Sequence, residues 1–453
     1  MEMGYNTPYM MQGLNGFKLS KFFLLLPVLG IMFVSSGTLF PFIVGKYVWF
    51  RTMVGFSLIA FIWGLLFQDA NSAMWHRLKA VLKQPLVIAV TIFIAVFLLA
   101  CFFGVDPAMS FWSNFERGEG GLQLLNMWAF FVLLVTLLKE EKDWHTLFGF
   151  ALAGGVLMAA YGFMAGAGVQ GYLGPKFLAD RFQGSIGNPA YVAAYALFML
   201  FYAAYVLVSK YRTKLLSFGA IVLYVLSMIF IAVFWLAATR GAFMGFVASL
   251  VAFLGYFLYT KKHWRKWLLV ALVAVILVVG TLIKFKDSSF VKSIPGSRIF
   301  DISVSAQTFE DRTYMWHTAV EGFTKRPLLG WGPENYLKVF DRYMDIGYFK
   351  PAAGFGSWFD RAHSIYFDYL VETGILGLLS YLGIFIVFYW QFVKKSAQHS
   401  ILASQTAVER ALLFSILFAY LVQGIVLFDV SPIYTNVFLI LAFGAYQFHP
   451  VRD

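Results

Sequence analysis

Long apolar runs constrain the fold of this chain more than any other feature of its sequence. A run of roughly 18 or more apolar residues can cross about 30 Å of hydrocarbon as a helix. The chain has 453 residues, of which 60% are hydrophobic and only 13% charged, so its core is built against lipid. We therefore predict an all-α polytopic membrane protein with about twelve transmembrane helices. The expected spans are 20–38, 48–67, 85–104, 120–138, 145–167, 189–208, 215–237, 241–259, 267–284, 365–390, 409–427 and 431–448.

Basic residues in the short loops predict the orientation of the spans. Such residues favour the cytoplasmic side of a membrane. Loops after even-numbered spans hold Arg77, Lys79, Lys83, Lys139, Lys142, Lys210, Arg212, Lys214, Lys261, Lys262, Arg265, Lys266, Lys394 and Lys395. Short loops after odd-numbered spans hold only Lys46, Arg117, Lys176, Arg181 and Arg240. Both termini are therefore expected to be cytoplasmic. The net charge of +12 largely reflects this topology and gives little support to nucleic-acid binding.

The longest connection, residues 286–362, is predicted to face outward as a partly helical lid. Its stretch "TFEDRTYMWHTAVEGFTKRP" places Met315, Trp316, Ala319, Val320 and Phe323 on one helical face. This pattern predicts an amphipathic helix on the membrane surface or capping the bundle. A glycine-rich turn and a second short helix near Glu334 are expected to follow. The chain is thus expected to divide into residues 1–285 with nine spans, the loop 286–362, and residues 363–453 with three spans.

Processing and covalent cross-links place few constraints on the chain. The first 17 residues lack a basic start followed by a cleavage site, so we predict no removable signal peptide and an uncleaved signal-anchor. The single cysteine, Cys101, lies inside a predicted span. No disulfide framework is therefore expected in the outer segments.

Topology separates the seven histidines of the chain. The expected cytoplasmic ones are His76, His145, His263, His399 and His449. Only His317 and His363 are expected to face outward. His317 lies beside the apolar face of the predicted amphipathic helix, where a packing or surface role is expected. His363 opens the tenth span in "DRAHSIYFDYLVETGILG", where lid and membrane meet, and is our candidate catalytic residue.

Three outward arginines lie near the N-termini of inward-running spans. They are Arg181, Arg240 and Arg361, and the positive ends of their helices point outward. Asn188 is a natural N-cap for one of these spans, with Pro189 at the first helical position. Helix N-termini and guanidinium groups together form an anion site whose geometry suits phosphate. The alternative is that these arginines contact lipid headgroups, as is common at span ends.

Two further residues could support this site. Arg117, in "SFWSNFERGEGG", either joins the anion site or pairs with its neighbours Glu116 and Glu119. Glu372 lies about two and a half helical turns below His363. Glu372 either tunes the histidine or makes a structural hydrogen bond across the bundle.

The sequence lacks the usual signals for a metal or a nucleotide. No outward group of carboxylates has the spacing of a divalent-metal site, and no phosphate-binding glycine loop with its lysine is present. We therefore expect no metal and no cofactor. An outward-facing membrane enzyme that works without ATP needs an activated donor delivered in the membrane. A lipid diphosphate sugar fits this need because it carries its own leaving group.

Several motifs resemble the O-antigen ligase family, bacterial membrane enzymes that join lipid-linked O-polysaccharide to lipid A–core. From His363 the chain reads His-Ser, nine residues, Gly374, two residues and Gly377, which resembles the family signature. The block "DRTYMWHTAVEGFTKRPLLGWGPENY" is similar to the family's outer-loop block, including its arginine, here Arg312. The stretches "RFQGSIGNPAYVAAY", "TRGA" and "SFWSNFERGEGG" also resemble family blocks. The resemblance covers residues 104–390.

The resemblance implies a GT-C-like fold and a metal-independent, inverting glycosyl transfer. It implies that His363 is the general base for the acceptor hydroxyl, and that Arg181 and Arg240 hold the donor diphosphate. The implied partners are an undecaprenyl diphosphate-linked glycan, an acceptor such as lipid A–core, and membrane lipids. The implied location is the bacterial inner membrane, with the active site facing the periplasm.

Related functions differ mainly in the acceptor. O-antigen polymerases and protein O-oligosaccharyltransferases share the donor and the chemistry, and we expect ligation first because the histidine signature is intact. A lipid-linked sugar transporter is the alternative from another class, because transporters place polar groups at mid-membrane. Here the span cores are nearly free of charge apart from Arg51 and Glu372, and the polar groups gather at one face. This asymmetry favours an enzyme.

Overall fold

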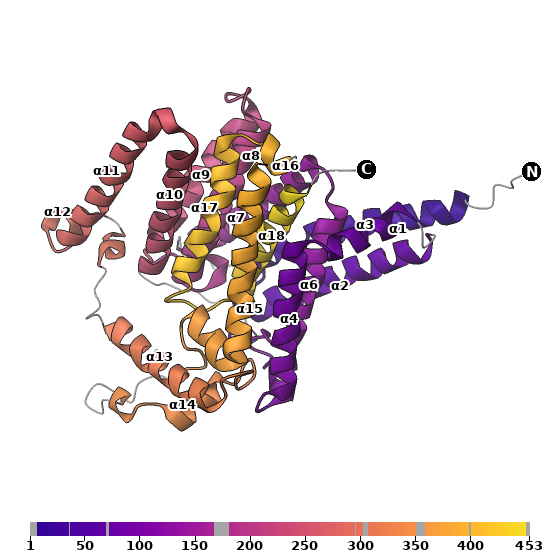
Figure 1. Ribbon diagram of the computed structural model, residues 1–453. Helices are drawn as coiled ribbons and strands as arrows, with labels where there is room; N and C mark the ends of the chain where they lie inside the picture. Colours follow the sequence, from indigo (N-terminus) through magenta and orange to yellow (C-terminus); the bar gives the residue numbers. More distant parts are fainter. Residues whose placement is uncertain are drawn as a thin grey trace, which may run out of the picture.

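The regular structure of the chain is helical throughout the described residues. The computed structural model describes residues 7–35, 37–68, 72–166, 181–294, 296–301, 307–349, 358–397 and 400–449 (Figure 1). Its longer helices are α1 (Thr7–Leu25), α2 (Val44–Leu66), α3 (Ala73–Leu82), α4 (Pro85–Phe103), α6 (Gly121–Leu137), α7 (Glu141–Gly166), α8 (Pro189–Lys210), α9 (Phe218–Leu236), α10 (Arg240–Thr260), α11 (Arg265–Lys284), α13 (Gln307–Lys325), α14 (Tyr336–Tyr343), α15 (Ile365–Ser396), α17 (Ala407–Gln423) and α18 (Ser431–Phe448). The shorter ones are α5 (Pro107–Trp112), α12 (Ser289–Lys292), α16 (Ile401–Ser404) and the 3-10 turns η1 (Pro27–Met32), η2 (Gly184–Ile186), η3 (Lys262–Trp264), η4 (Ser297–Phe300) and η5 (Ile346–Tyr348).

The described residues contain nine helical segments long and apolar enough to cross a membrane. These segments involve α1 with η1, α2, α4, α7, α8, α9, α10, α11 and α15. The all-α, polytopic expectation is therefore confirmed. Of the three other expected spans, one corresponds to the shorter apolar helix α6, and the last two correspond to α17 and α18. The total of twelve spans and the outward position of residues 286–362 stay predictions. Lys176, a basic residue of a predicted outward loop, and His399, predicted to be cytoplasmic, lie outside the described residues.

The first helix begins earlier than the sequence analysis predicted. Residues 20–38 were the expected span, but α1 occupies Thr7–Leu25 and a 3-10 turn follows from Pro27. Proline has no backbone N–H and clashes with the preceding turn, so the α-helix cannot continue through it. α1 packs closely on α2, because a Cβ atom on Gly16 would lie 2.7 Å from the backbone nitrogen of Gly64. The pair leans away from the other helices (Figure 1).

Residues 307–349 pack against one end of the bundle. α13 and α14 lie beside the N-terminal part of α15 (Figure 1). The predicted amphipathic helix is α13, and its buried side chains include Met315 and Ala319, whereas Val320 is exposed. These side chains form a small second core with Trp331, Val339 and other residues of the loop. Of the two predicted placements, α13 therefore adopts the one that caps the bundle.

α15 is broken where the long connection, residues 286–362, packs against it. Gly374 has φ +65° and ψ −169°, which is not helical. The backbone groups freed by the break bond to residues 327–332: Trp331 N–H donates to Val371 O at 2.9 Å, and Ile375 N–H donates to Pro327 O at 2.8 Å. Irregular backbone is tolerated in a spanning helix only when protein satisfies its polar groups. The break therefore depends on the 327–332 segment and ties that segment to the bundle.

We expect Gly374→Ala to destabilise the fold. A non-glycine residue at this combination of φ and ψ, which essentially only glycine adopts, costs about 1–3 kcal/mol, and the added Cβ would also overlap the carbonyl of Leu328. The measurement is the melting temperature of the purified protein in detergent. Gly383→Ala is the matched control, because Gly383 lies in the same helix with no atom within 4 Å of an added Cβ. Equal melting temperatures for the two variants would contradict the role assigned to the break.

Candidate active site: an arginine pocket beside His363

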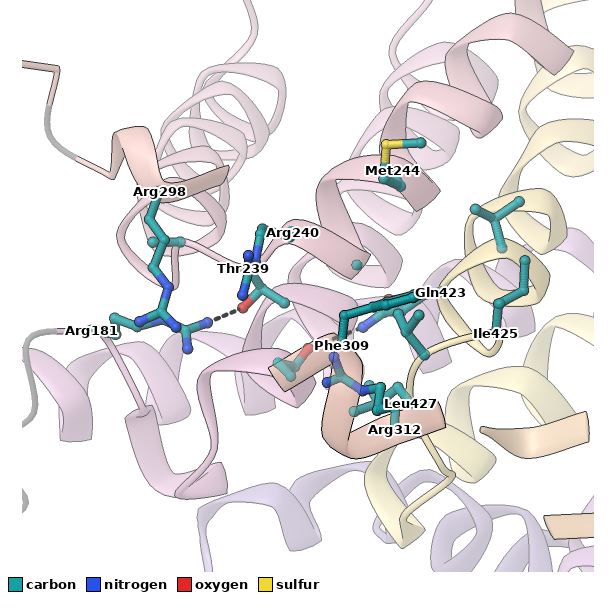
Figure 2. Close-up of a pocket in the computed structure, with 15 residues that line it drawn as sticks. Arg181, Thr239, Arg240, Met244, Arg298, Phe309, Arg312, Gln423, Ile425 and Leu427 are labelled. Atoms are coloured by element: carbon teal, nitrogen blue, oxygen red, sulfur yellow. Dashed lines mark hydrogen bonds between the residues drawn. The ribbon is translucent and has the colours of Figure 1, made fainter. Parts of the chain in front are cut away.

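Four arginines from four separate segments line one cavity of about 390 Å³. Arg181 precedes η2, Arg240 opens α10, Arg298 lies in η4 and Arg312 lies in α13 (Figure 2). No carboxylate is among the described residues that line the cavity. The structure thus brings together three arginines singled out from the sequence, and adds Arg298. Four guanidinium groups without a lining carboxylate make a site suited to an anion.

Neutral groups hold Arg181 in place. Its Nε donates to Ala237 O at 2.9 Å and its Nη2 donates to the Thr239 hydroxyl at 2.6 Å. These bonds orient the guanidinium without cancelling its charge. Burial lowers the pKa of Arg181, and the positive charges of Arg298 and Arg240 lower it further. An anion in the cavity would relieve this repulsion.

Arg240 is held by Asp301, the residue that directly follows η4. Its Nη1 donates to the backbone carbonyl of Asp301 at 2.8 Å and lies 3.8 Å from the Asp301 carboxylate. That carboxylate also pairs with Lys286. The Asp301 carboxylate is thus shared between two cations.

Two helix N-termini add to the positive potential of the cavity. Ala190 in the first turn of α8 and Gly241 in the first turn of α10 both line it. As predicted, Asn188 caps α8, and its side chain accepts from Ala190 N–H at 2.9 Å, with Pro189 in the first turn. The positive ends of α8 and α10 therefore reach the same cavity as the arginines.

His363 lies on a tightly held turn next to this pocket. Its backbone is left-handed, with φ +57°, and its Nδ1 is 3.2 Å from Arg361 O. The ring packs against Phe359 and Phe428, with ring centres 5.2 and 5.1 Å away. Phe428 directly follows Leu427, which lines the arginine pocket. When Nδ1–H donates to the carbonyl, Nε2 keeps its lone pair and can accept a proton.

The surroundings of His363 favour its neutral form. Burial lowers its pKa, and the positive charges of Arg312 and Arg117 add to this effect. The hydrogen bond to Arg361 O and the Asp360 charge act in the opposite direction but do not reverse the shift. A neutral imidazole at neutral pH is the form that a general base needs.

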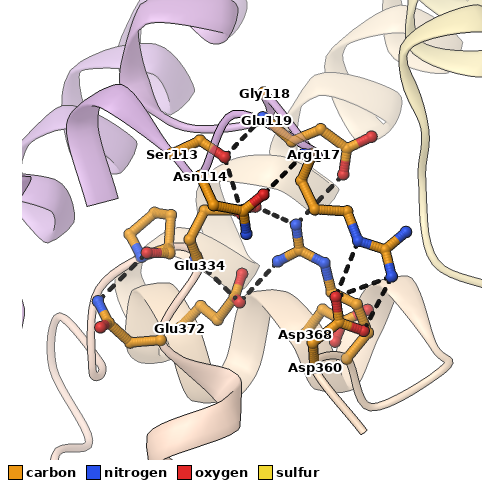
Figure 3. Close-up of polar contacts among 12 residues, drawn as sticks. Ser113, Asn114, Arg117, Gly118, Glu119, Glu334, Asp360, Asp368 and Glu372 are labelled. Carbon is orange, nitrogen blue, oxygen red and sulfur yellow. Dashed lines mark hydrogen bonds and ion pairs between the residues drawn. The ribbon is translucent and has the colours of Figure 1, made fainter. Parts of the chain in front are cut away.

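Arg361 does not lie in the arginine pocket with which the sequence analysis grouped it. Its side chain is buried, with 6% of the residue exposed. Nη1 donates to Glu372 at 2.8 Å, Nη2 donates to Glu119 at 3.2 Å, and Nη2 also pairs with Glu334. Figure 3 shows these carboxylates converging on one guanidinium. We call this set of four residues the Arg361 cluster.

The Arg361 cluster joins three segments of the chain. Glu119 precedes α6, Glu334 belongs to the outer connection, and Glu372 lies in α15. Glu372 also accepts from the backbone N–H of Glu334 at 3.1 Å, so its contacts are those of a structural hydrogen-bonding residue. Burial raises the pKa of Glu119 to about 8. The three carboxylates raise the pKa of Arg361 well above its usual value, although burial alone would lower it.

The remaining candidates have partners that the sequence analysis did not predict. Arg117 pairs with Asp360, not with its neighbours in sequence: Nε lies 2.8 Å from Oδ2 and Nη2 lies 3.0 Å from Oδ1. Glu116 instead accepts from the backbone N–H of Phe40 at 2.8 Å. His317 is exposed, as expected for a surface role. Arg298 could not be predicted as a pocket residue from the sequence, because nothing in its local pattern distinguishes it from other basic residues of the connection 286–362.

The described part of the chain also contains no group of three or more His, Cys, Asp or Glu side chains that could hold a metal ion. Positive charge at the site comes from arginines and helix ends.

The helices and the site together define a polytopic membrane protein with an arginine-lined pocket at one end of its bundle. Residues 224–382 match the family model described as O-antigen ligase, and this match supports an assignment to that family. The matched region runs from α9 into α15 and contains Arg240, Arg298, Arg312 and His363, whereas Arg181 precedes it. Comparison with curated proteins finds no match. The resemblance inferred from the motifs is therefore confirmed at the level of the family, whose members are glycosyltransferase-like enzymes.

We expect Arg361→Met to lower stability strongly, because it leaves buried carboxylates without their cation. Breaking a buried ion pair in this way costs about 3–5 kcal/mol. Lys338→Met is the control, because it breaks a partly exposed pair with Asp106 and should change the melting temperature little. If the Arg361→Met protein kept its melting temperature and lost only donor binding, Arg361 would be part of the anion site and not a structural residue.

Proposed function

We propose that this protein transfers a glycan from an undecaprenyl diphosphate-linked donor to an acceptor hydroxyl, with lipid A–core as the acceptor. The reaction takes place on the periplasmic face of the bacterial inner membrane. The observation that carries the proposal is the four-arginine pocket whose lining residue Leu427 is followed by Phe428, the ring that packs against His363. The match of residues 224–382 to the O-antigen ligase family model supports it.

The arginine pocket binds the diphosphate of the donor. Guanidinium groups grip phosphate oxygens two at a time, and the α8 and α10 N-termini add backbone N–H donors. Negative charge grows on the diphosphate as its bond to the sugar breaks, and groups already oriented in the pocket stabilise that charge. The arginines supply the positive charge that a divalent cation provides in other enzymes, so the transfer is metal-independent.

His363 activates the acceptor. Its Nε2 takes the proton of the acceptor hydroxyl as that oxygen attacks the anomeric carbon. The bond between this carbon and the diphosphate oxygen breaks, so the configuration inverts and undecaprenyl diphosphate leaves. The proton then passes from the imidazolium to water. Polymerases and protein O-oligosaccharyltransferases would use the same donor chemistry, and the choice of acceptor separates them.

We expect His363→Ala to fold normally and to lose transfer by about 10²- to 10⁴-fold, the usual contribution of a general base. The assay uses purified protein, lipid-linked donor and lipid A–core, in EDTA and without ATP. His317→Ala is the matched control, because His317 is exposed on α13. Near-normal transfer by His363→Ala would remove the base assignment.

We also expect wild-type transfer to proceed in EDTA. Loss of wild-type transfer in EDTA with recovery on adding Mg²⁺ or Mn²⁺ would overturn the metal-independent mechanism.

We expect Arg181→Lys and Arg240→Lys to raise the KM for the donor about tenfold, with larger losses for the alanine variants. Lysine keeps the charge but lacks the planar fork that binds two oxygens. Steady-state kinetics with varied donor measure the effect. Full activity of both lysine variants would instead indicate a simple charge or headgroup contact.

A further inference from the structure

A second polar region borders His363, separate from the arginine pocket. Arg117 and Asp360 form a two-bond ion pair, with distances of 2.8 and 3.0 Å (Figure 3). Neither residue lines the arginine pocket. The Asp360 side chain is 40% exposed, whereas that of Arg117 is 14% exposed. The Asp360 carboxylate is thus partly accessible to solvent, while the guanidinium that holds it is mostly buried.

Aromatic rings connect this pair to His363. The Arg117 guanidinium lies over Phe40 and Phe428, 4.8 and 5.7 Å from their ring centres. Phe428 also packs on the His363 ring at 5.1 Å. Phe40 is 39% exposed, whereas Phe428 is buried, with 8% of the residue exposed. The packed rings therefore connect the exposed part of this region to the candidate base.

The pair is not needed as a structural anchor. Glu119 lies two residues after Arg117, and Arg361 directly follows Asp360. The Arg361 cluster therefore already joins the same two segments through a fully buried contact. A partly exposed ion pair adds little to stability beyond that. The position of the Arg117–Asp360 pair next to His363 instead points to a role in ligand binding.

The chemistry of this region suits a saccharide better than a phosphate. Arginine and aspartate cancel each other's charge, so the region lacks the positive excess of the arginine pocket. Carboxylate oxygens accept hydrogen bonds from sugar hydroxyls, and aromatic rings pack against the apolar C–H faces of a pyranose. Ligand sites commonly combine aromatic walls with a few placed polar groups.

We propose that Arg117, Asp360 and Phe40, supported from below by the buried Phe428, form the subsite that binds the acceptor saccharide and presents its hydroxyl to His363. This inference rests on the proposed function, in which the donor diphosphate occupies the arginine pocket. The acceptor must then reach the base from a different region, and the Arg117–Asp360 region is joined to His363 through the Phe428 ring, outside that pocket. The acceptor class is a saccharide hydroxyl, not a protein side chain.

The test is steady-state kinetics with lipid-linked donor and core oligosaccharide freed of lipid A as the varied acceptor. Asp360→Asn and Arg117→Lys should raise the acceptor KM about tenfold, since each loses a charge-assisted hydrogen bond or its geometry. The donor KM and kcat should change less than twofold. Asp106→Asn is the matched control, because Asp106 is also 40% exposed in an ion pair, and asparagine can still cap α5.

The double variant Arg117→Asp, Asp360→Arg separates recognition from folding. It can restore the ion pair, so a normal melting temperature with a raised acceptor KM supports the subsite. Recovery of both quantities would show a purely structural pair and overturn it. An unchanged acceptor KM in active Asp360→Asn, or a raised donor KM instead, would also overturn the subsite and leave the proposed function standing.

Wild-type transfer to a serine- or threonine-containing peptide in place of the oligosaccharide would overturn the acceptor class. Absence of wild-type transfer to every acceptor would remove the proposed function itself.

Discussion

The buried contact between Arg361 and three carboxylates is the interaction on which the arrangement at this end of the bundle depends. Removing one guanidinium and three carboxylates from water is costly, and their mutual attraction offsets that cost only in good geometry. Glu119, Glu334 and Glu372 supply that geometry from three different segments. The backbone carbonyl of the same arginine lies 3.2 Å from His363 Nδ1. One residue thus joins the outer connection to the bundle and orients the candidate base.

Arginines with the same chemistry have different roles here because their partners differ. Arg361 is surrounded by carboxylates, so its charge is used within the protein. Arg181 is held by a carbonyl and a hydroxyl, which orient it but leave its charge available to an anion. Arg117 lies between these cases, with one carboxylate that is partly exposed. Position within the fold, not residue type, therefore separates a structural arginine from the arginines proposed to bind the donor and the acceptor.

The break in α15 links these features to the membrane-spanning helices. Gly374 interrupts the helix, and the backbone of residues 327–332 bonds to the freed groups. Gly332 N–H donates to Glu372 O at 2.8 Å, immediately beside the Arg361 cluster. The outer connection is thus held by backbone bonds and by ion pairs at the same level of α15. His363, at the start of this helix, is held by the same arrangement.

Features that depend on local pattern were determined by the sequence. Apolar runs predicted the spanning helices, because hydrocarbon thickness sets their length. Asn188 and Pro189 predicted the start of α8, because capping involves only neighbouring residues. The histidine signature and the arginine-containing blocks indicated the family. Only the tertiary structure decided that Arg361 pairs with three carboxylates, that Arg117 pairs with Asp360, and that Arg298 joins the pocket. Ion pairs depend on burial and on which distant segments meet, and a one-dimensional pattern shows a charge without its partner.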